Sequence, residues 1–388
     1  VQMRVTGLLR NEQDATIKAQ VAGSVPAAIA LLRDPRLGLL SRHPLPGGEP
    51  TGQVQATVTV SLPLSARDTI DQVAIRAKAH FTRLHIGRVA AGRDLDNGAL
   101  DLTADNAGLT VDGSARLAGI PAQMRASMDF RAGSPEQVTQ RIEFSGRPDA
   151  SDLARAGLDA GDVLTGPVPL NATLIERRNG SGTLDVKADL TGASLQVAPL
   201  GWRKSAGVAA SGRAELRLDR DRLIRIDPIS LDGAGLEVRG QAEVSQGRVS
   251  AVRASRIVLG RSVGQATVLL PANGPVAVSL TGSMLDLSGR FGPSRPREKP
   301  ASPAVASARG PGWSLDARLD RVSLGRDRTL GDVVVHAVDD GRVLRELRFD
   351  GVTGSRAAVE LSVQPESTGG RERRSVVASA ADAGALLR

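Results

Sequence analysis

Hydrophobic and polar residues alternate along most of the chain with a period of two, which is typical of half-buried β-strands. Ala15, Ile17, Ala19 and Val21 are separated by polar residues and would share one face of a strand. The same alternation recurs at 54–62, 109–111, 184–190, 214–218, 236–238, 268–270, 276–280, 315–319 and 333–337. Gly, Asp and Asn separate the segments, as at 96–98 and 178–180, where positive φ angles favour tight hairpins. The pattern predicts a mainly β protein built as an antiparallel meander.

Helix signals are few. Ser24 followed by Pro26 predicts a short helix through 27–32, and Asp149 or Ser151 could cap another over 152–156. Residues 290–311 hold five of the 21 prolines, a composition typical of an extended linker or long loop. We therefore expect a β-segment over 1–289, a Pro/Arg-rich linker or loop over 290–311, and a continuing β-segment over 312–388.

An internal repeat joins residues 105–117 to residues 232–244, which share the pattern D-x-A-G-L-x-V-x-G-x-A-x-[L/V]. In each copy two aliphatic residues face one side of a strand, and the next glycine bends or bulges it. The repeat indicates a repetitive β-architecture, and its role is structural.

The amino-acid composition argues against several classes of function. Hydrophobic residues make up 41% of the chain, but aromatic residues make up 2% and Tyr and Cys are absent, so the core must be aliphatic. Without aromatic stacking platforms, single-stranded nucleic acid is disfavoured as a partner. Without cysteine, and with four scattered histidines, thiol chemistry, disulfides and a zinc site lack their residues. We predict no cofactor and no metal site.

The net charge of +8 has a local origin. Residues 290–311 contribute +4 and residues 371–374 contribute +2, and we expect both to lie in loops. The rest of the chain is close to neutral, so we expect no nucleic-acid partner. No apolar run is long enough to span a bilayer, and Val1 to Arg4 do not form a signal peptide. We therefore expect an internal segment of a longer protein whose anchor or targeting signal lies elsewhere.

Motifs for catalysis are weak. Residues 260–264 fit the G-x-S-x-G nucleophile elbow, but the residues that follow predict a strand where the elbow needs a helix. Residues 94–98 and 219–221 resemble fragments of calcium loops without the later carboxylates, and hairpin turns explain them better. We expect no enzyme, and a hydrolase built around Ser262 is a distant third hypothesis.

The remaining signal is a repeated strand face. Arg213, Glu215 and Arg217 alternate with Ala214, Leu216 and Leu218, so one face is charged and the other wholly aliphatic. Such a face needs a cover: the sheet closes on itself, coils into a solenoid, or curls into a trough that lipid chains occupy. The candidate lining residues of a lipid groove are Leu184, Val186, Leu216, Leu218, Leu236, Val238, Val268, Leu270, Val278 and Leu280.

Several segments resemble the central region of YhdP-type AsmA-like proteins. The resemblance covers most of residues 15–388, and it is carried by 119–121, 128–130, 152–159, 164–168, 188–191, 199–204 and 280–288. It implies an elongated, twisted antiparallel β-sheet curled into a groove, as in the AsmA/TamB-like proteins, with a few short helices. Residues 379–388 look like the entry to the family's C-terminal AsmA-like domain, where the chain stops.

The resemblance also implies a setting and a function. Such proteins are periplasmic, tethered to the inner membrane, and carry phospholipid toward the outer membrane without catalytic residues. We expect non-enzymatic phospholipid transport that supports outer-membrane integrity. The partners would be phospholipid acyl chains, an inner-membrane anchor, and outer-membrane or envelope proteins. The alternative is a structural or assembly scaffold for outer-membrane biogenesis with a closed β-core.

Overall fold

The computed structural model describes residues 2–6, 14–32, 49–63, 73–90, 93–156, 160–220, 222–291, 311–325, 328–368 and 371–382. Over these residues, twenty-one strands belong to one large sheet and three short strands to a second sheet, with few short helices. The mainly β prediction is confirmed, and the large sheet is not closed. The chain divides into two compact units: unit 1 is Val1–Gly161, Pro167–Ala188 and Leu216–Leu223, and unit 2 is Asp162–Gly166, Asp189–Glu215 and Ile224–Arg388.

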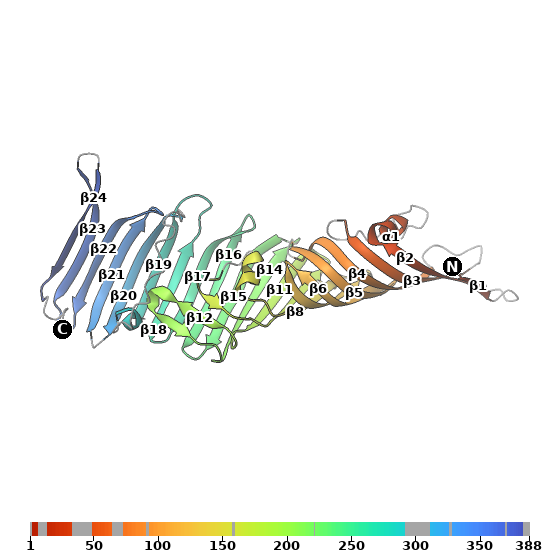
Figure 1. Cartoon of the computed structure of the whole chain (residues 1–388), viewed down its shortest axis with the longest axis horizontal. Coiled ribbons are helices and arrows are strands. Elements are labelled where there is room, and N and C mark those ends of the chain that lie inside the picture. The colour runs from red at the N-terminus through yellow and green to blue at the C-terminus, as the bar shows by residue number, and fades with distance from the viewer. Residues whose placement is uncertain are drawn as a thin grey trace. The chain divides into compact units, whose positions relative to one another are not determined.

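Unit 1 is an antiparallel meander, as predicted (Figure 1). Each strand pairs with the next one along the chain from β1 to β8, then β8 pairs with β10 and β10 with β11. Its strands are β1 (Gln2–Thr6), β2 (Asp14–Ser24), β3 (Thr51–Pro63), β4 (Ala74–Ala90), β5 (Arg93–Asp105), β6 (Gly108–Leu117), β7 (Ile120–Asp129), β8 (Val138–Gly146), β10 (Leu170–Arg177) and β11 (Ser181–Asp189).

Both predicted helices of unit 1 are present. Helix α1 spans Val25–Leu32, and the Ser24 hydroxyl accepts a hydrogen bond from the backbone N–H of Ala27 at 3.3 Å. Helix α2 spans Ala150–Arg155, and the Asp149 carboxylate accepts from the backbone N–H groups of Ser151 and Asp152. Of the two candidate caps, Asp149 is therefore the one used, because its oxygen satisfies donors that the first turn leaves unpaired.

Unit 2 repeats the meander with one exception. Strands β16 to β19 are antiparallel, β19 pairs with β20 in parallel, and β20 to β24 are antiparallel. The strands are β15 (Arg222–Gly233), β16 (Leu236–Ser245), β17 (Arg248–Leu259), β18 (Ser262–Leu269), β19 (Val276–Asp286), β20 (Trp313–Gly325), β21 (Arg328–Asp339), β22 (Leu344–Thr353), β23 (Ala358–Thr368) and β24 (Arg371–Ala380). Two strands are divided between the units: the second part of β14 (Ala210–Asp219), from Leu216, and the first two residues of β15 belong to unit 1.

Short elements accompany the large sheet of unit 2. Strands β9 (Leu164–Thr165), β12 (Ser194–Val197) and β13 (Trp202–Lys204) form the small sheet. A 3₁₀ turn spans Ala198–Leu200 and helix α3 spans Ser288–Phe291. Of the predicted linker, residues 292–310 lie outside the described residues. The strands on either side of it, β19 and β20, pair directly.

Strand register gives unit 1 one apolar face and one polar face. A row of directly paired residues crosses nine strands on one side: Gly23, Val54, Phe81, Leu100, Gly113, Met124, Phe144, Ala172 and Val186. The neighbouring row points to the other side: Ala22, Gln55, His80, Asp101, Asp112, Arg125, Glu143, Thr173 and Asp185. Because side chains alternate along a strand, these two rows define the apolar face and the polar face of unit 1.

The same division holds in unit 2. Its apolar face carries the row Ile226, Ala242, Val252, Val268, Val278, Leu315, Ala337, Leu347 and Val363. Its polar face carries the row Gln241, Arg253, Thr267, Ser279, Asp316, His336, Arg348 and Ser362. The alternation in the sequence therefore survives as two chemically distinct surfaces in each unit.

The internal repeat forms equivalent strands, β6 and β16. A methyl group on Gly240 would lie 2.6 Å from the carbonyl oxygen of Arg253, and one on Gly113 would clash with the carbonyl oxygen of Ala99. Both glycines are thus required by close backbone approach, which fits their expected structural role.

Two local predictions are wrong. Residues 96–98 lie within β5, where Asn97 has a positive φ of 49° next to a bulge, so they form no hairpin turn. Residues 371–374 begin strand β24, so their charge does not lie in a loop. In contrast, residues 178–180 form the predicted turn, closed by a bond from the Gly180 N–H to the Arg177 carbonyl at 2.9 Å.

Candidate functional site

The candidate lining residues of unit 1 share its apolar face. Leu184 and Val186 on β11 pair directly with Leu174 and Ala172 on β10. The Cβ of Leu218 lies 3.3 Å from where a Cβ on Gly182 would stand, and Gly182 points to the same side as Leu184. Leu216, two residues earlier on β14, follows Leu218 to that side.

The candidates of unit 2 also share one face. Val268 pairs with Val278, and Leu280 pairs with Ala266, one position along the same face. Leu236 and Val238 pair with Leu259 and Ile257. Leu270 follows the end of β18 with the same alternation as Val268, and its N–H donates to the carbonyl of Ser250 at 2.8 Å.

Burial distinguishes these candidates. Leu218 and Leu236 are 5% and 4% exposed, so each belongs to a packed interior. Leu184, Val186, Leu216, Val238, Val268, Leu270, Val278 and Leu280 are half-buried. Aliphatic side chains on much of both apolar faces thus keep contact with solvent, at a cost proportional to their exposed area.

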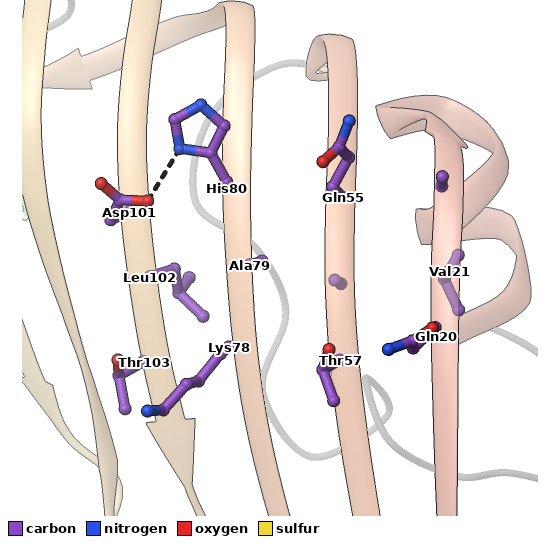
Figure 2. A pocket seen from close by; sticks show the side chains of 12 residues that line it. Gln20, Val21, Gln55, Thr57, Lys78, Ala79, His80, Asp101, Leu102 and Thr103 are labelled. Carbon is purple, nitrogen blue, oxygen red and sulfur yellow. Dashed lines mark hydrogen bonds and ion pairs between the residues drawn. The ribbon is translucent and has the colours of Figure 1, made fainter. Parts of the chain in front are cut away.

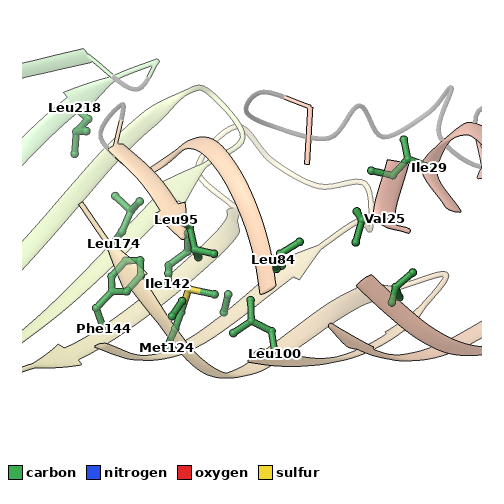
Figure 3. Packing of buried hydrophobic residues seen from close by; sticks show 13 residues of the cluster. Val25, Ile29, Leu84, Leu95, Leu100, Met124, Ile142, Phe144, Leu174 and Leu218 are labelled. Carbon is green, nitrogen blue, oxygen red and sulfur yellow. The ribbon is translucent and has the colours of Figure 1, made fainter. Parts of the chain in front are cut away.

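One part of the apolar face of unit 1 is sealed (Figure 3). Leu84 and Leu95, from the bent end of the β4–β5 hairpin, are 4% and 1% exposed; Leu95 lies opposite residues of β7, β8 and β10, and Leu84 lies near Leu100 of β5. We call this packed group the sealed cluster. Its buried members are Val25, Ile29, Val54, Leu84, Leu95, Leu100, Ala115, Met124, Ala126, Ile142, Phe144, Leu174 and Leu218.

The hairpin was missed from the sequence. Leu84 and Ile86 are two residues apart and so carried a strand signal, but the bend that turns them over the face depends on bulges. Register shifts fall between Phe81 and Leu84 on β4 and between Asp96 and Ala99 on β5, at the same level of the hairpin. Bulges of this kind increase local twist and bend a strand pair.

Unit 2 has a buried cluster of its own among the described residues. Leu319, Val322, Leu330 and Val333 form its buried cluster, with Leu280 among the half-buried residues that pack against it. In the small sheet, Lys204 is 4% exposed, and its Nζ donates to the carbonyl oxygens of Leu190 at 2.8 Å, Ala193 at 2.7 Å and Ser205 at 3.3 Å. Burial lowers the pKa of Lys204, and the charge of Asp189 partly opposes that shift.

The polar face of unit 1 carries a shallow trough of about 590 Å³ over β2 to β5 (Figure 2). Gln20, Gln55, Lys78, His80 and Asp101 contribute side chains to its walls, and the His80 Nδ1 lies 2.7 Å from the Asp101 Oδ1. The same cross-strand pairing joins His336 to Asp316 in unit 2, also at 2.7 Å. Because this arrangement occurs on both polar faces, it is a cross-strand pair that repeats on the sheet surface.

The hydrolase motif lacks its geometry. Ser262 is 5% exposed and begins β18, and its hydroxyl accepts a hydrogen bond from the Asp286 N–H at 2.9 Å. In a nucleophile elbow the serine instead sits on a sharp turn between a strand and a helix, with its hydroxyl exposed. Across the described part of the chain, no group of three potential metal-ligating His, Asp or Glu side chains comes together. None of the described helices is long and apolar enough to cross a membrane.

Among the described residues, each unit has one aspartate at or just after a strand end whose pKa is strongly lowered. In unit 1, hydrogen bonds from the Arg131 side chain and backbone hold the pKa of Asp129 well below its ordinary value. In unit 2, the backbone N–H groups of Val343 and Arg342 lower the pKa of Asp340 to about 2. Hydrogen bonds to the ionised carboxylate account for both shifts.

Compared with protein-family models, with curated proteins and with solved structures, the chain matches none.

Proposed function

We propose that the chain is a non-enzymatic lipid-transfer segment whose apolar faces hold phospholipid acyl chains while the head groups stay in water. One observation carries this proposal. In each unit an unbroken row of apolar or glycine residues crosses nine strands, and many of the aliphatic residues on that face are half-buried. Solvent-exposed aliphatic surface of this extent is typical of a binding surface.

The free energy of burying acyl chains favours a lipid as the ligand. A two-chain phospholipid exposes about thirty CH₂ groups in water, at roughly 0.8 kcal/mol each, or on the order of 25 kcal/mol. A face of Val, Leu, Ile and Ala offsets most of this cost without chemical energy. Such side chains offer no hydrogen-bonding groups, so the face would accept acyl chains without reading their identity.

The resemblance to YhdP-type AsmA-like proteins supplies the setting of the proposal. In that setting, the sheet curls into a groove in the periplasm, in a protein tethered to the inner membrane, and phospholipid moves toward the outer membrane. Contacts with an anchor and with outer-membrane or envelope proteins would be made by other parts of that protein.

A second candidate is a scaffold with a closed β-core that aids outer-membrane biogenesis through protein contacts. The sealed cluster favours it, because part of the apolar face of unit 1 is already covered by the chain itself. The two candidates differ over the half-buried positions: a scaffold leaves them empty, whereas a transfer protein fills them with lipid.

A matched pair of variants separates these candidates. Val278 and Ser279 are neighbours on β19, half-buried on the apolar face and exposed on the polar face, respectively. Lipid transfer predicts that Val278→Asp markedly lowers binding of cis-parinaric acid, a fluorescent fatty acid, by removing the apolar face of unit 2 from use, while Ser279→Asp binds like the wild type. Circular dichroism checks that both variants fold. Equal binding by the two folded variants, or none by the wild type, contradicts the proposal.

A further inference from the structure

Strand β24 is an edge of the large sheet in unit 2. It pairs with β23 along its whole length, and no other strand in the described part of the chain pairs with it. Figure 1 shows β24 at the end of the sheet, beside β23. An edge strand presents a row of unpaired backbone N–H and C=O groups, which can pair with a strand of another chain.

The hydrogen bonds to β23 show which residues of β24 face the open edge. Ala381, directly after β24, donates its N–H to the Ala358 carbonyl at 3.0 Å. Hydrogen-bonded and non-hydrogen-bonded pairs alternate along an antiparallel ladder, so the odd-numbered residues of β24 bond to β23. The even-numbered residues direct their N–H and C=O groups to the open edge. These outward-facing residues are Glu372, Arg374, Val376, Ala378 and Ala380.

The middle of this edge is apolar and exposed. Val376 and Val377 are 65% and 59% exposed. Val376 pairs with Val363, on the apolar row of unit 2, whereas Val377 pairs with Ser362, on the polar row. Natural sheets often protect an edge strand with charged residues, but β24 carries no charge after Arg374. The second half of β24 is therefore an unprotected edge.

The sequence of β24 is complementary to itself in one antiparallel register. If Val376 lies opposite Val376 of a second copy, all five outward-facing residues of each strand have a partner. Arg374 then lies opposite Ala378 of the second copy, which keeps like charges from lying directly opposite each other, an arrangement that destabilises a strand pair. A two-fold axis through the Val376 pair relates the copies, and an isologous contact of this kind closes at a dimer.

We propose that β24 is a dimerisation edge through which two copies of the chain join their large sheets. Because the two-fold axis is perpendicular to the sheet, the apolar rows of unit 2 in the two copies lie on the same side and meet at Val376. The inference goes beyond the proposed function and does not depend on it. Where lipid binds as well, the dimer joins two apolar faces into one surface.

Single cysteines test the register directly, because the chain has none of its own. In the proposed dimer the two Cα atoms at position 376 are about 5.5 Å apart, which suits a disulfide. The two Cα atoms at position 377 are diagonal neighbours, about 7 to 8 Å apart, which is too far. Mild oxidation should therefore cross-link Val376→Cys at least about tenfold faster than Val377→Cys. Equal rates, or faster cross-linking at position 377, would overturn the proposal.

Sedimentation velocity without added lipid measures the assembly itself. We expect the wild type to form a dimer. Val376→Pro removes an N–H group that faces the open edge and leaves the ladder to β23 intact, so this variant should be a folded monomer. Val377→Ser removes a neighbouring exposed valine from the polar face and should remain a dimer. Circular dichroism checks that both variants fold.

Three results would contradict the two-fold dimer. The first is a wild type that stays monomeric at every concentration, and the second is a folded Val376→Pro that dimerises like the wild type. The third is a series of larger species, which head-to-tail pairing of β24 with β1 of another copy would produce. Because lipid is absent from these measurements, each result leaves the binding of cis-parinaric acid as a separate test of the proposed function.

Discussion

The two units turn the same sequence pattern into differently covered surfaces. In unit 1 the apolar row passes under a hairpin bent over it, and thirteen residues are buried in one cluster. In unit 2 the burial is more dispersed: within its described residues, four buried residues of β20 and β21 form one cluster, and Leu236, Ala242 and Ala251 are buried outside that cluster. Alternation therefore decides which residues share a face, while bulges and positive φ angles decide how much of that face is covered.

The largest expected effect is on stability. Leu100 in unit 1 is 2% exposed, whereas Leu315 in unit 2 is half-buried on its apolar row. Leu100→Ala should lower the free energy of unfolding by about 2 to 5 kcal/mol, because it leaves a cavity. Leu315→Ala should cost about 1 kcal/mol, because less area is lost from the interior.

Urea unfolding can follow the units separately. Both tryptophans, Trp202 and Trp313, belong to unit 2, so their fluorescence reports that unit while circular dichroism reports both. Similar losses of unfolding free energy in the two leucine variants would mean that the apolar faces of the two units are equally closed.

An intermediate effect is expected in unit 2 from its buried lysine. Lys204→Met keeps an aliphatic stem but removes the ammonium donor from the Leu190 and Ala193 carbonyls. Removing this charged donor from the buried carbonyl oxygens should cost about 2 kcal/mol. Tryptophan fluorescence during urea unfolding measures the loss, and Arg203→Met, at an exposed cation on the same strand of unit 2, is the control. A loss equal to that of the control would show that the lysine contributes no net stability.

The smallest expected effect is on stability at low pH. Because the folded-state pKa of Asp340 is about 2, below its ordinary value of 3.8, ionised Asp340 stabilises the fold above pH 4. That contribution is lost as the pH falls from about 4 to about 2. Asp340→Asn should therefore flatten the acid side of the stability profile of unit 2, measured by tryptophan fluorescence. Asp129→Asn should do the same for unit 1, measured by circular dichroism.

An unchanged acid profile in Asp340→Asn would mean that its hydrogen bonds to the Val343 and Arg342 N–H groups do not stabilise the folded state. Asp320→Asn, at another exposed aspartate of unit 2, serves as the neutralising control.

The faces were predictable because alternation is a local property. The strands over 54–62, 276–280 and 333–337 form as expected, and the candidate residues Val278 and Leu280 fall on one side of β19. The repeat glycines were also predictable in role, since a glycine inside a strand pattern signals close backbone approach. All of these features depend on residues a few positions apart.

Other features depend on distant partners. The β4–β5 bend needs neighbouring bulges in two strands, and nothing in 83–97 alone shows that Leu95 packs over β8. The parallel pairing of β19 with β20 joins segments on either side of the Pro/Arg-rich stretch, where composition signalled only a boundary. Strand β24 was not predicted at 371–374, because charged residues are poor strand formers. Charged residues are nevertheless common on edge strands.

Native mass spectrometry of the purified chain tests most directly the claim that the apolar faces hold acyl chains. The protein is purified without detergent and its bound lipids are identified, alongside Val278→Asp and Ser279→Asp. The account predicts phospholipid on the wild type and on Ser279→Asp, and a marked loss from Val278→Asp. A folded wild type that carries no phospholipid and acquires none from phosphatidylglycerol vesicles would contradict it.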